Sequence, residues 1–250
     1  MTVRTADRTL DIFEHFAERR EPITASQLAR DLSLPTSTCF SLIRTLVDRG
    51  YLYYLQSRGP FYPTRRLLSI AEEIATHDPI AQYVRPLLVA LRDKAGETVI
   101  LGKLKGTGVV YLERVESNQP IRYSRRIGFV RDIHASSIGK AILAIMDDKT
   151  RDRLLAQVRY PKLTDKTIRT RAQLIDSVDE GRKRGYWLNV DESTPDVTGI
   201  AQPVPIFGDF YGVALIGPSY RFERNMTAYA KALTKTVHKV SEAVSELKRN

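Results

Sequence analysis

Short hydrogen-bonding side chains and an arginine recur with helical spacing between residues 36 and 44 of this 250-residue chain. Small polar side chains allow a helix to approach base edges and phosphates closely, and arginine is a frequent donor to guanine. The chemistry open to this face is hydrogen bonding to duplex DNA; the alternative is an ordinary solvated helix surface. The face consists of Thr36, Ser37, Thr38, Ser41 and Arg44, opposite a predicted core stripe of Phe40, Ile43, Leu46 and Val47.

Patterns typical of catalysis and metal binding are missing from the sequence. The only cysteine is Cys39, no Gly-x-Ser-x-Gly motif is present, and the four histidines lack metal-ligand spacing. His134 is expected to orient the loop before a helix. We therefore predict no catalytic residue, no metal site and no cofactor, and a protein that is not an enzyme.

The polar face needs a second helix to hold it, and residues 23–50 supply one. Thr24 and Gln27 have the spacing of a capping box, which starts a short helix. Pro35 suits the first turn of the following helix, and Gly50 suits its C-terminal end. We predict a helix-turn-helix in which Ser26 and Gln27 also face DNA.

Two short apolar runs after Gly50 complete this unit. The runs YLYYL (51–55) and FYPT (61–64) flank the turn-forming residues QSRGP, which predicts a β-hairpin. Arg58 would lie at the tip of the hairpin, where it could contact a phosphate or enter a minor groove. The first 64 residues, with a further helix over 5–19, are predicted to form a winged helix-turn-helix.

The net charge of +10 is not concentrated in this unit. Residues 1–78 contain ten arginines and ten acidic residues, so the excess lies in residues 79–250. Between residues 32 and 71, however, five arginines accompany a single acidic residue. A local basic surface is what phosphate contact requires, so the local excess supports the DNA-binding prediction.

Three segments follow from the pattern of helices and turns. The winged unit covers residues 1–64, a linker helix that Thr64 can cap covers 65–78, and a second domain covers 79–250 after the turn-forming pair Asp78-Pro79. The sequence has no apolar leader and no apolar run of about 18 residues. We therefore expect a cytoplasmic protein without a membrane segment.

The second domain combines strands and helices. Helices are predicted over 80–95, over SSIGKAILAIM (136–146), over 171–184 and over 225–247. Strands are predicted at TVILGKL (98–104), VVYLERVE (109–116), IRYSRR (121–126), 186–190, 199–204 and 211–216. The apolar stripe of the last helix is expected to pack on the sheet, although a coiled coil is the alternative. The fold class is α+β, with an antiparallel sheet flanked by helices in the second domain.

Several motifs resemble the IclR family of bacterial transcription regulators. LPTSTCFSLIRTLVDRGYL (34–52) is similar to the stretch with the family's recognition helix, and YLERVES (111–117) and HASSIGKAILA (134–144) are similar to motifs of its second domain. The resemblance runs nearly end to end. It implies a winged helix joined by a linker helix to a GAF-like effector-binding domain, and homodimers that can pair into tetramers.

The resemblance also indicates where an effector would bind. Gly199 stands where the family usually has Cys, Ser or Ala, and Asn189 replaces the usual Asp or Ser. Together with Ala214 and Ile216, Gly199 should make the pocket roomier and more apolar, which favours an aromatic or bulky apolar organic acid. The expected effector-binding residues are Ser137, Ile138, Asn189, Glu192, Val197, Gly199, Ala214 and Ile216.

Two further features could attract an acid. A helix N-terminus at residues 136–139 favours an anion, and capping with close packing is the alternative. Arg122, Arg125, Arg126 and Arg131, with Lys140, could contact an acidic effector, although charged runs are more often solvated.

The sequence thus predicts an effector-responsive regulator of a catabolic operon. It would bind a double-stranded, roughly palindromic operator as a homodimer or a dimer of dimers, with a small-molecule organic acid as its ligand. A nonspecific architectural DNA-binding protein is the first alternative, because of the overall charge. An enzyme that uses the second domain is a weaker one.

Overall fold

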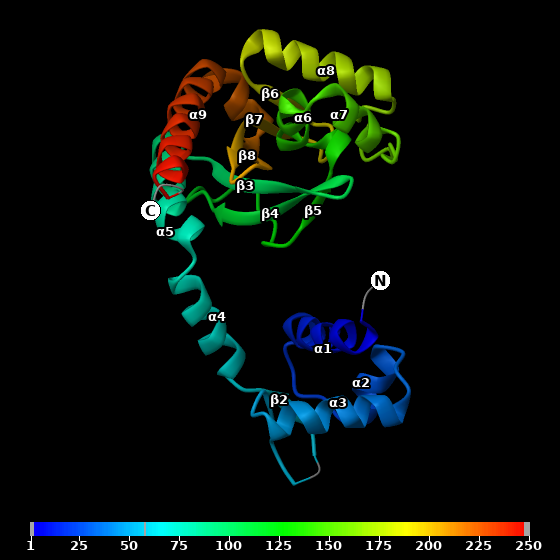
Figure 1. Cartoon of the computed structure of the whole chain (residues 1–250). Coiled ribbons are helices and arrows are strands. Elements are labelled where there is room, and N and C mark those ends of the chain that lie inside the picture. Colours follow the sequence, from blue (N-terminus) through cyan, green and yellow to red (C-terminus); the bar gives the residue numbers. More distant parts are fainter. Residues whose placement is uncertain (1–2, 58, 248–250) are drawn as a thin grey trace. The chain divides into compact units, whose positions relative to one another are not determined.

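The computed structural model describes residues 3–57 and 59–247. The chain divides into two compact units, Met1–Asp78 and Pro79–Asn250 (Figure 1).

The first unit is a three-helix domain with a small antiparallel hairpin. Its α2 begins with the predicted capping box: the Thr24 side chain accepts from the Gln27 backbone, and the Gln27 side chain accepts from the Thr24 backbone. Ile12 and Phe16 of the first helix pack with Ile43 and Phe61 in one buried cluster. The elements are α1 (Arg4–Arg19), α2 (Ala25–Asp31), α3 (Thr36–Asp48), β1 (Leu52–Tyr54), β2 (Phe61–Pro63) and α4 (Arg66–Thr76).

Two details of α3 differ from the sequence prediction. Pro35 is not in the first turn but immediately precedes the helix, with extended backbone (ψ 134°). Phe40 is not in the core: half of it is exposed, while Cys39 and Leu42 are buried. Helix α3 turns residues 39, 42, 43 and 46 inward, and position 40 therefore faces outward with Ser37 and Ser41.

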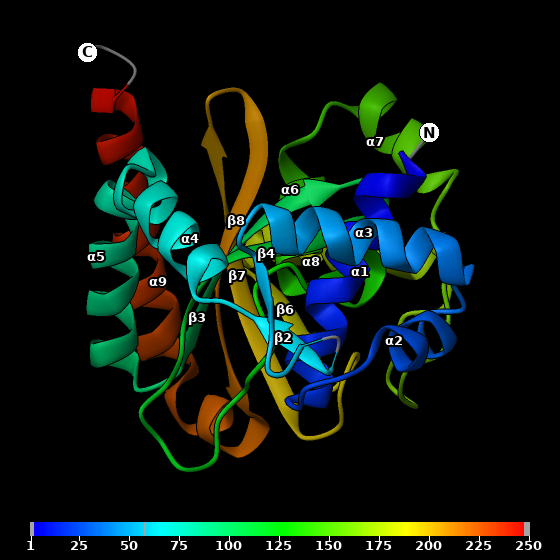
Figure 2. The same cartoon turned by 90° about the horizontal axis from the view of Figure 1, so that it is seen from below.

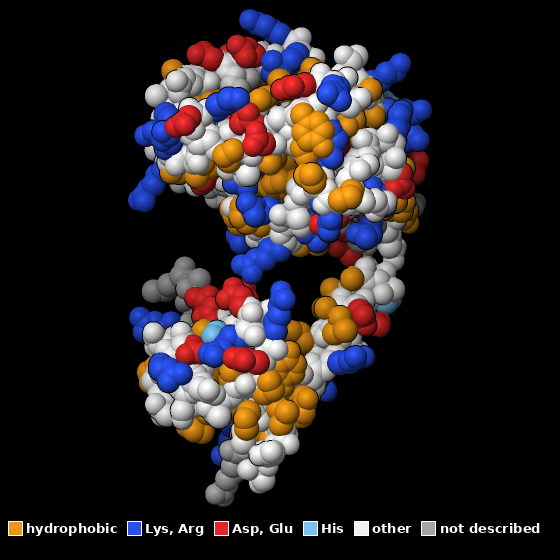
Figure 3. Space-filling view, turned by 180° about the vertical axis from the view of Figure 1, so that it is seen from behind, with side chains coloured by type: hydrophobic (Ala, Val, Ile, Leu, Met, Phe, Trp, Pro, Cys, Tyr) orange, Lys and Arg blue, Asp and Glu red, His pale blue; other side chains and the backbone are white. Residues whose placement is uncertain are grey.

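The linker helix α4 has no buried residue. Leu67, Leu68 and Ile74 are all exposed. Hydrophobic side chains are visible on the surface over α4 and over the hairpin (Figure 3). An amphipathic helix with an uncovered apolar side has free surface for a partner.

The second unit is built on a six-stranded antiparallel sheet with the order β5-β4-β3-β8-β7-β6. The strands are β3 (Thr98–Lys105), β4 (Gly108–Val115), β5 (Val130–Asp132), β6 (Trp187–Val190), β7 (Val197–Ile206) and β8 (Asp209–Pro218). The helices are α5 (Pro79–Ala95), the 3-10 turn η1 (Ile133–Ala135), α6 (Ser137–Ile145), α7 (Asp148–Leu155), α8 (Arg171–Arg184) and α9 (Ser219–Leu247).

Helices cover both faces of the sheet, which produces two hydrophobic cores. In Figure 2, α5 and α9 lie on one side of the sheet, and α6 and α8 on the other. The predicted apolar stripe of α9 packs on the sheet, with Leu233, Val240 and Val244 buried in the first core. Ile138, Ile142 and the other inward residues of α6 form the second core with the opposite face of the sheet.

Two predictions about this unit were wrong in part, and one helix was not predicted. Residues 121–126 form no strand; β4 pairs with β3 and with β5, which begins at Val130. Helix α7 was not predicted, because its sequence DKTRDRLL buries only Leu155 and lacks apolar periodicity. Helix α9 starts at Ser219, ahead of the predicted Asn225. Among the described residues, no helix is both long and apolar enough to cross a membrane.

Candidate DNA-binding face and ligand pocket

The outer side of α3 carries the predicted polar face. Thr36, Ser37, Ser41 and Arg44 are exposed, and Thr38 is half-buried. The Arg44 side chain is 85% exposed, and its Nε lies 3.8 Å from Asp48 Oδ2, a weak contact that leaves the guanidinium available. Four positions of this face are therefore exposed enough to meet a groove of DNA.

Two hydroxyl groups of α3, those of Ser41 and Thr45, donate to carbonyl groups within the helix. Ser41 Oγ donates to the Ser37 carbonyl at 3.0 Å, and Thr45 Oγ1 donates to the Ser41 carbonyl at 2.9 Å. The oxygen of Ser41 keeps its acceptor capacity, which suits an amino group on a base edge. Phe40 adds an exposed ring among these groups, and thymine methyl groups are its natural apolar partner in a major groove.

The other residues predicted to contact DNA are Ser26, Gln27 and Arg58. Ser26 is exposed, whereas the Gln27 side-chain oxygen is held at 2.8 Å by both the backbone nitrogen and the hydroxyl of Thr24. Arg58 lies outside the described residues. Arg66 lies over the ring of Tyr51, at 5.3 Å from the centroid, and so stays beside the base of the hairpin.

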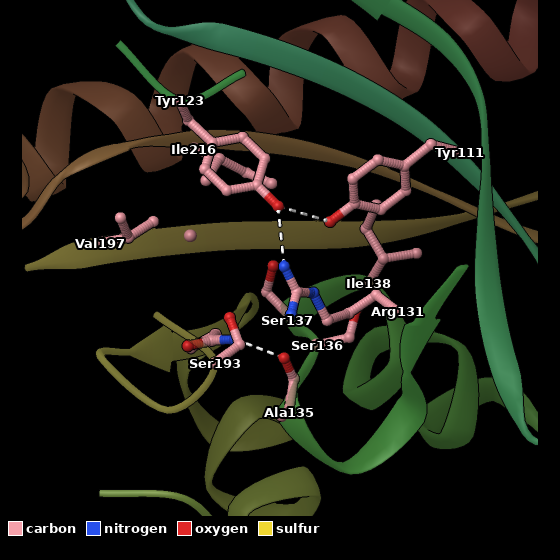
Figure 4. A pocket seen from close by; sticks show the side chains of 12 residues that line it. Tyr111, Tyr123, Arg131, Ala135, Ser136, Ser137, Ile138, Ser193, Val197 and Ile216 are labelled. Atoms are coloured by element: carbon pink, nitrogen blue, oxygen red, sulfur yellow. Dashed lines mark hydrogen bonds between the residues drawn. The ribbon is translucent and has the colours of Figure 1, made fainter. Parts of the chain in front are cut away.

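The second unit contains a small pocket between the end of the sheet and the N-terminus of α6 (Figure 4). Its polar lining comes from β4, β5, α6, β6 and two connecting segments, and its apolar lining from η1, α6, β7 and β8. The polar members are Tyr111, Tyr123, Arg131, Ser136, Ser137, Asn189 and Ser193; the others are Ala135, Ile138, Val197, Gly199 and Ile216.

Arg131 is the charged group of the pocket. Its Nη2 donates to the Tyr123 hydroxyl at 3.2 Å, and that hydroxyl lies 3.3 Å from the Tyr111 hydroxyl. Burial raises the pKa of Tyr111 well above its usual value, so this hydroxyl stays neutral. Burial opposes the charge on Arg131, but the neighbouring Tyr123 and Tyr111 hydroxyls outweigh it and raise its pKa. Arg131 is therefore a permanent cation.

The wall of the pocket opposite Arg131 is held by a hydrogen-bonded loop. Asn189 Nδ2 donates to the Ala135 carbonyl at 2.6 Å and to Ser193 Oγ at 3.2 Å, while Asn189 Oδ1 accepts from the Glu192 backbone. Lys140 of α6 donates to both Glu192 carboxylate oxygens, at 2.5 and 2.8 Å, and to the Leu188 carbonyl. Burial lowers the pKa of Lys140 and raises that of Glu192; their mutual contact opposes both shifts.

Of the eight residues expected to bind an effector, the structure brings six together in the pocket: Ser137, Ile138, Asn189, Val197, Gly199 and Ile216. Glu192 instead forms an ion pair with Lys140 and is not among the lining residues. Ala214 is fully buried and pairs with Ala201 across the sheet. Glu192 and Ala214 therefore do not line this cavity, and their contact with an effector stays a prediction.

The pocket is also narrower and more polar than expected. Its volume is about 20 Å³, room for about one water molecule. A side chain on Gly199 would crowd Ser137, because a Cβ there would lie 3.1 Å from Ser137 Oγ. The missing side chain at position 199 therefore makes room for a serine hydroxyl instead of enlarging the cavity.

Sequence reasoning missed three polar lining residues, Tyr111, Tyr123 and Ser193. Tyr111 begins the family-like motif YLERVES, but only the fold brings it and Tyr123 to the same cavity as Arg131. Tyr123 and Val197 also line a surface groove of about 800 Å³, so the cavity and the groove are separated by these two side chains. A route from the pocket to the groove would therefore require one of these two side chains to move.

His134 lies fully buried behind the pocket. A nitrogen of its ring, Nε2, lies 3.2 Å from the Pro161 carbonyl oxygen, and the ring packs edge-on against Tyr160. Burial lowers the pKa of His134, which favours the neutral ring. These contacts support the structural role predicted for His134 before α6.

Sequence profiles of known families match both units. The profile described as the IclR helix-turn-helix domain matches residues 5–56, and the bacterial transcriptional regulator IclR C-terminal profile matches residues 72–245. The chain belongs to the IclR family. Members of this family are DNA-binding transcription regulators with an effector-binding domain, not enzymes.

Known transcription regulators are similar to the chain in sequence or in structure over nearly its whole length. It is 29% identical over 242 residues to the HTH-type transcriptional regulator BhcR of Paracoccus denitrificans, covering 96% of this chain and 86% of that protein. The crystal structure of the Thermotoga maritima IclR is 22% identical, covers 96% of this chain and 98% of that one, and has a TM-score of 0.81.

An IclR homolog from Microbacterium hydrocarbonoxydans has been solved in complex with 4-hydroxybenzoate. It is 21% identical, with a TM-score of 0.78, and the match covers 97% of this chain and 99% of that one. At this identity the likeness shows the fold alone. Another protein with the fold of this IclR-family member thus binds an aromatic acid.

Proposed function

We propose that this IclR-family regulator binds a roughly palindromic operator as a dimer, with α3 of each copy in a major groove. The observation that carries the proposal is the exposed face of α3, where small hydroxyl groups, the ring of Phe40 and the free guanidinium of Arg44 lie together. A dimer would place two such helices one helical turn of DNA apart. A bacterial operator lies in the cytoplasm, which is where we expect the protein to act.

The second unit supplies the regulation. We propose that an organic acid, aromatic or otherwise bulky and apolar, binds in the pocket and controls a neighbouring catabolic operon. The apolar wall of Ile138, Val197 and Ile216 supports a ring or hydrocarbon body, and Arg131 supports an acid. The Microbacterium homolog bound to 4-hydroxybenzoate supports the proposal of this ligand class.

Effector and operator would be coupled through the linker helix. Helix α4 is the segment between the winged domain and Pro79, so a change of its packing can change the spacing of paired α3 helices. Such coupling is reciprocal: an effector that lowers operator affinity is itself bound less tightly by the operator complex.

Footprinting on the promoter beside the gene tests the proposal. We expect a protected, near-palindromic site whose half-occupancy concentration shifts when 4-hydroxybenzoate or benzoate is added. Absence of a protected site, with and without acid, would overturn the proposal. Equal affinity for unrelated DNA, with a steep dependence on salt, would instead indicate the nonspecific binder that the charge of +10 allows.

A further inference from the structure

The pocket of the second unit holds a buried cation without a buried anion. Arg131 is only 8% exposed, and among the described residues it forms no ion pair with a carboxylate. The other buried lysine or arginine of the described residues, Lys140, is paired with Glu192, and the half-buried Arg221 is paired with Glu97. A buried charge normally has a partner of opposite sign, because desolvation is otherwise uncompensated.

None of the residues that line the pocket is acidic, and the groups in contact with the guanidinium are neutral: the Tyr123 hydroxyl and the Phe129 ring, whose centroid lies 4.8 Å from Cζ. Tyr123 and Tyr111 offer hydroxyl groups, and Ser136 caps the α6 N-terminus by accepting from the Gly139 backbone at 3.1 Å. The N-terminus of this nine-residue helix adds a positive dipole end next to Ser137. Figure 4 shows Arg131 between the two tyrosines and the two serines, directed into the cavity.

We propose that Arg131 is the anchor for the carboxylate of the effector, with Ser137 and the tyrosine hydroxyls as neutral hydrogen-bonding partners. This deepens the proposed function and rests on its assignment of the pocket to an acid. Guanidinium and carboxylate form two parallel hydrogen bonds, a geometry that a lysine cannot reproduce. The body of the acid then lies against Ile138, Val197 and Ile216, which favours a flat monocarboxylic acid such as a benzoate.

A ligand of this size requires the pocket to open. The free volume of about 20 Å³ does not hold a ring, and Tyr123 separates the cavity from the surface groove. The Tyr123 carbonyl is held by Thr98 Oγ1 at 2.8 Å, so the backbone at this position is fixed. Rotation of the Tyr123 ring toward the groove is therefore the movement that admits the acid and frees Arg131.

The test measures binding to the full chain by calorimetry and melting followed by the fluorescence of Trp187, the single tryptophan, which lies in the second unit. The probes are benzoate, 4-hydroxybenzoate, phenylacetate and pyruvate, with benzamide as the uncharged analogue. The variants are Arg131→Gln and Arg131→Lys, with Arg126→Gln as an exposed control on the same segment.

We expect at least one aromatic carboxylate to bind the wild type and Arg126→Gln, and benzamide to bind neither. Arg131→Gln should weaken carboxylate binding about 30-fold or more, because a buried charge pair loses one member; Arg131→Lys should retain part of the affinity. Without ligand, Arg131→Gln should melt no lower than the wild type, because an uncompensated buried charge has been removed.

Carboxylate binding unchanged in Arg131→Gln, or benzamide bound as tightly as benzoate, would overturn the anchor. So would a wild type that binds none of the four acids. Operator binding, measured on the same preparations, separates the two proposals. A protein that binds the operator, and whose acid binding is the same in the wild type and in Arg131→Gln, contradicts only the anchor. A wild type that binds an acid but no operator contradicts only the DNA-binding role.

Discussion

At the scale of single residues, the exposed face of α3 combines two kinds of group that recognise bases differently. Arg44 can donate two hydrogen bonds to a guanine, and the ring of Phe40 can contact a thymine methyl group. The exposure of Phe40 is costly in water, and contact with DNA would remove that cost. The two side chains therefore make separable predictions.

Arg44→Ala should weaken operator binding by about 1–3 kcal/mol if the guanidinium contacts a base edge. Gel-shift titration on the footprinted operator measures the change. Arg153→Ala, which removes an exposed arginine of the second unit, is the control and should leave operator affinity unchanged. An unaltered affinity for Arg44→Ala would remove Arg44 from the contacts.

Phe40→Ala should lose about 1 kcal/mol of operator affinity, since only half of the ring remains to be buried. Replacing thymines of the operator by uracil one at a time should weaken the wild type at one position in each half-site. The same replacement should have no effect on Phe40→Ala. If the ratio of wild-type affinity to Phe40→Ala affinity is the same on every uracil-substituted operator, Phe40 contacts no thymine methyl group.

At the scale of elements, the buried pair of Lys140 and Glu192 ties α6 to the loop between β6 and β7. The side chains are 1% and 12% exposed, so both charges are largely out of water. The same loop carries Ser193 into the pocket wall, where its hydroxyl accepts from Asn189 of β6. Loss of the pair should therefore affect the stability of the unit as well as the pocket.

Lys140→Met should lower the free energy of unfolding of the second unit by about 3–5 kcal/mol, because Glu192 is left buried and unpaired. The double variant Lys140→Met/Glu192→Leu should recover most of this loss, since no charge stays behind. Urea titration followed by Trp187 fluorescence measures both. A double variant as unstable as the single one would show that the pair itself, not the orphaned charge, determines stability.

At the scale of the whole molecule, the chain consists of two units, and the boundary between them lies just after α4. Helix α4 leaves Leu67, Leu68 and Ile74 exposed at 41%, 53% and 67%. Exposed apolar stripes of this kind mark interaction surfaces. A second copy of the chain is the partner that a palindromic operator requires.

We predict a dimer in solution that Leu67→Glu/Ile74→Glu weakens at least about tenfold, because each aliphatic side chain contributes about 1.5–3 kcal/mol when buried. Light scattering after gel filtration at several concentrations measures the dissociation constant. Ser69→Glu is the matched control, an added charge at an exposed position of the same helix. A dimer equally tight in both variants would place the interface elsewhere.

The sequence alone determined the features that depend on neighbours along the chain. The capping box of Thr24 and Gln27, the hairpin after Gly50 and the apolar stripe of α9 were predicted correctly, because each follows from local spacing. The side of α3 that faces solvent was predicted with one error, at Phe40. The resemblance to the IclR family also predicted six of the residues that line the pocket.

Tertiary structure alone decided which distant groups share a cavity. Arg131 was one of several basic residues in the sequence, and only the pairing of β4 with β5 places it beside Tyr111. Glu192 was assigned to the pocket and proved to pair with Lys140. Whether a charge is buried, and whether an opposite charge meets it, depends on contacts between segments far apart in the chain. Local sequence spacing does not contain that information.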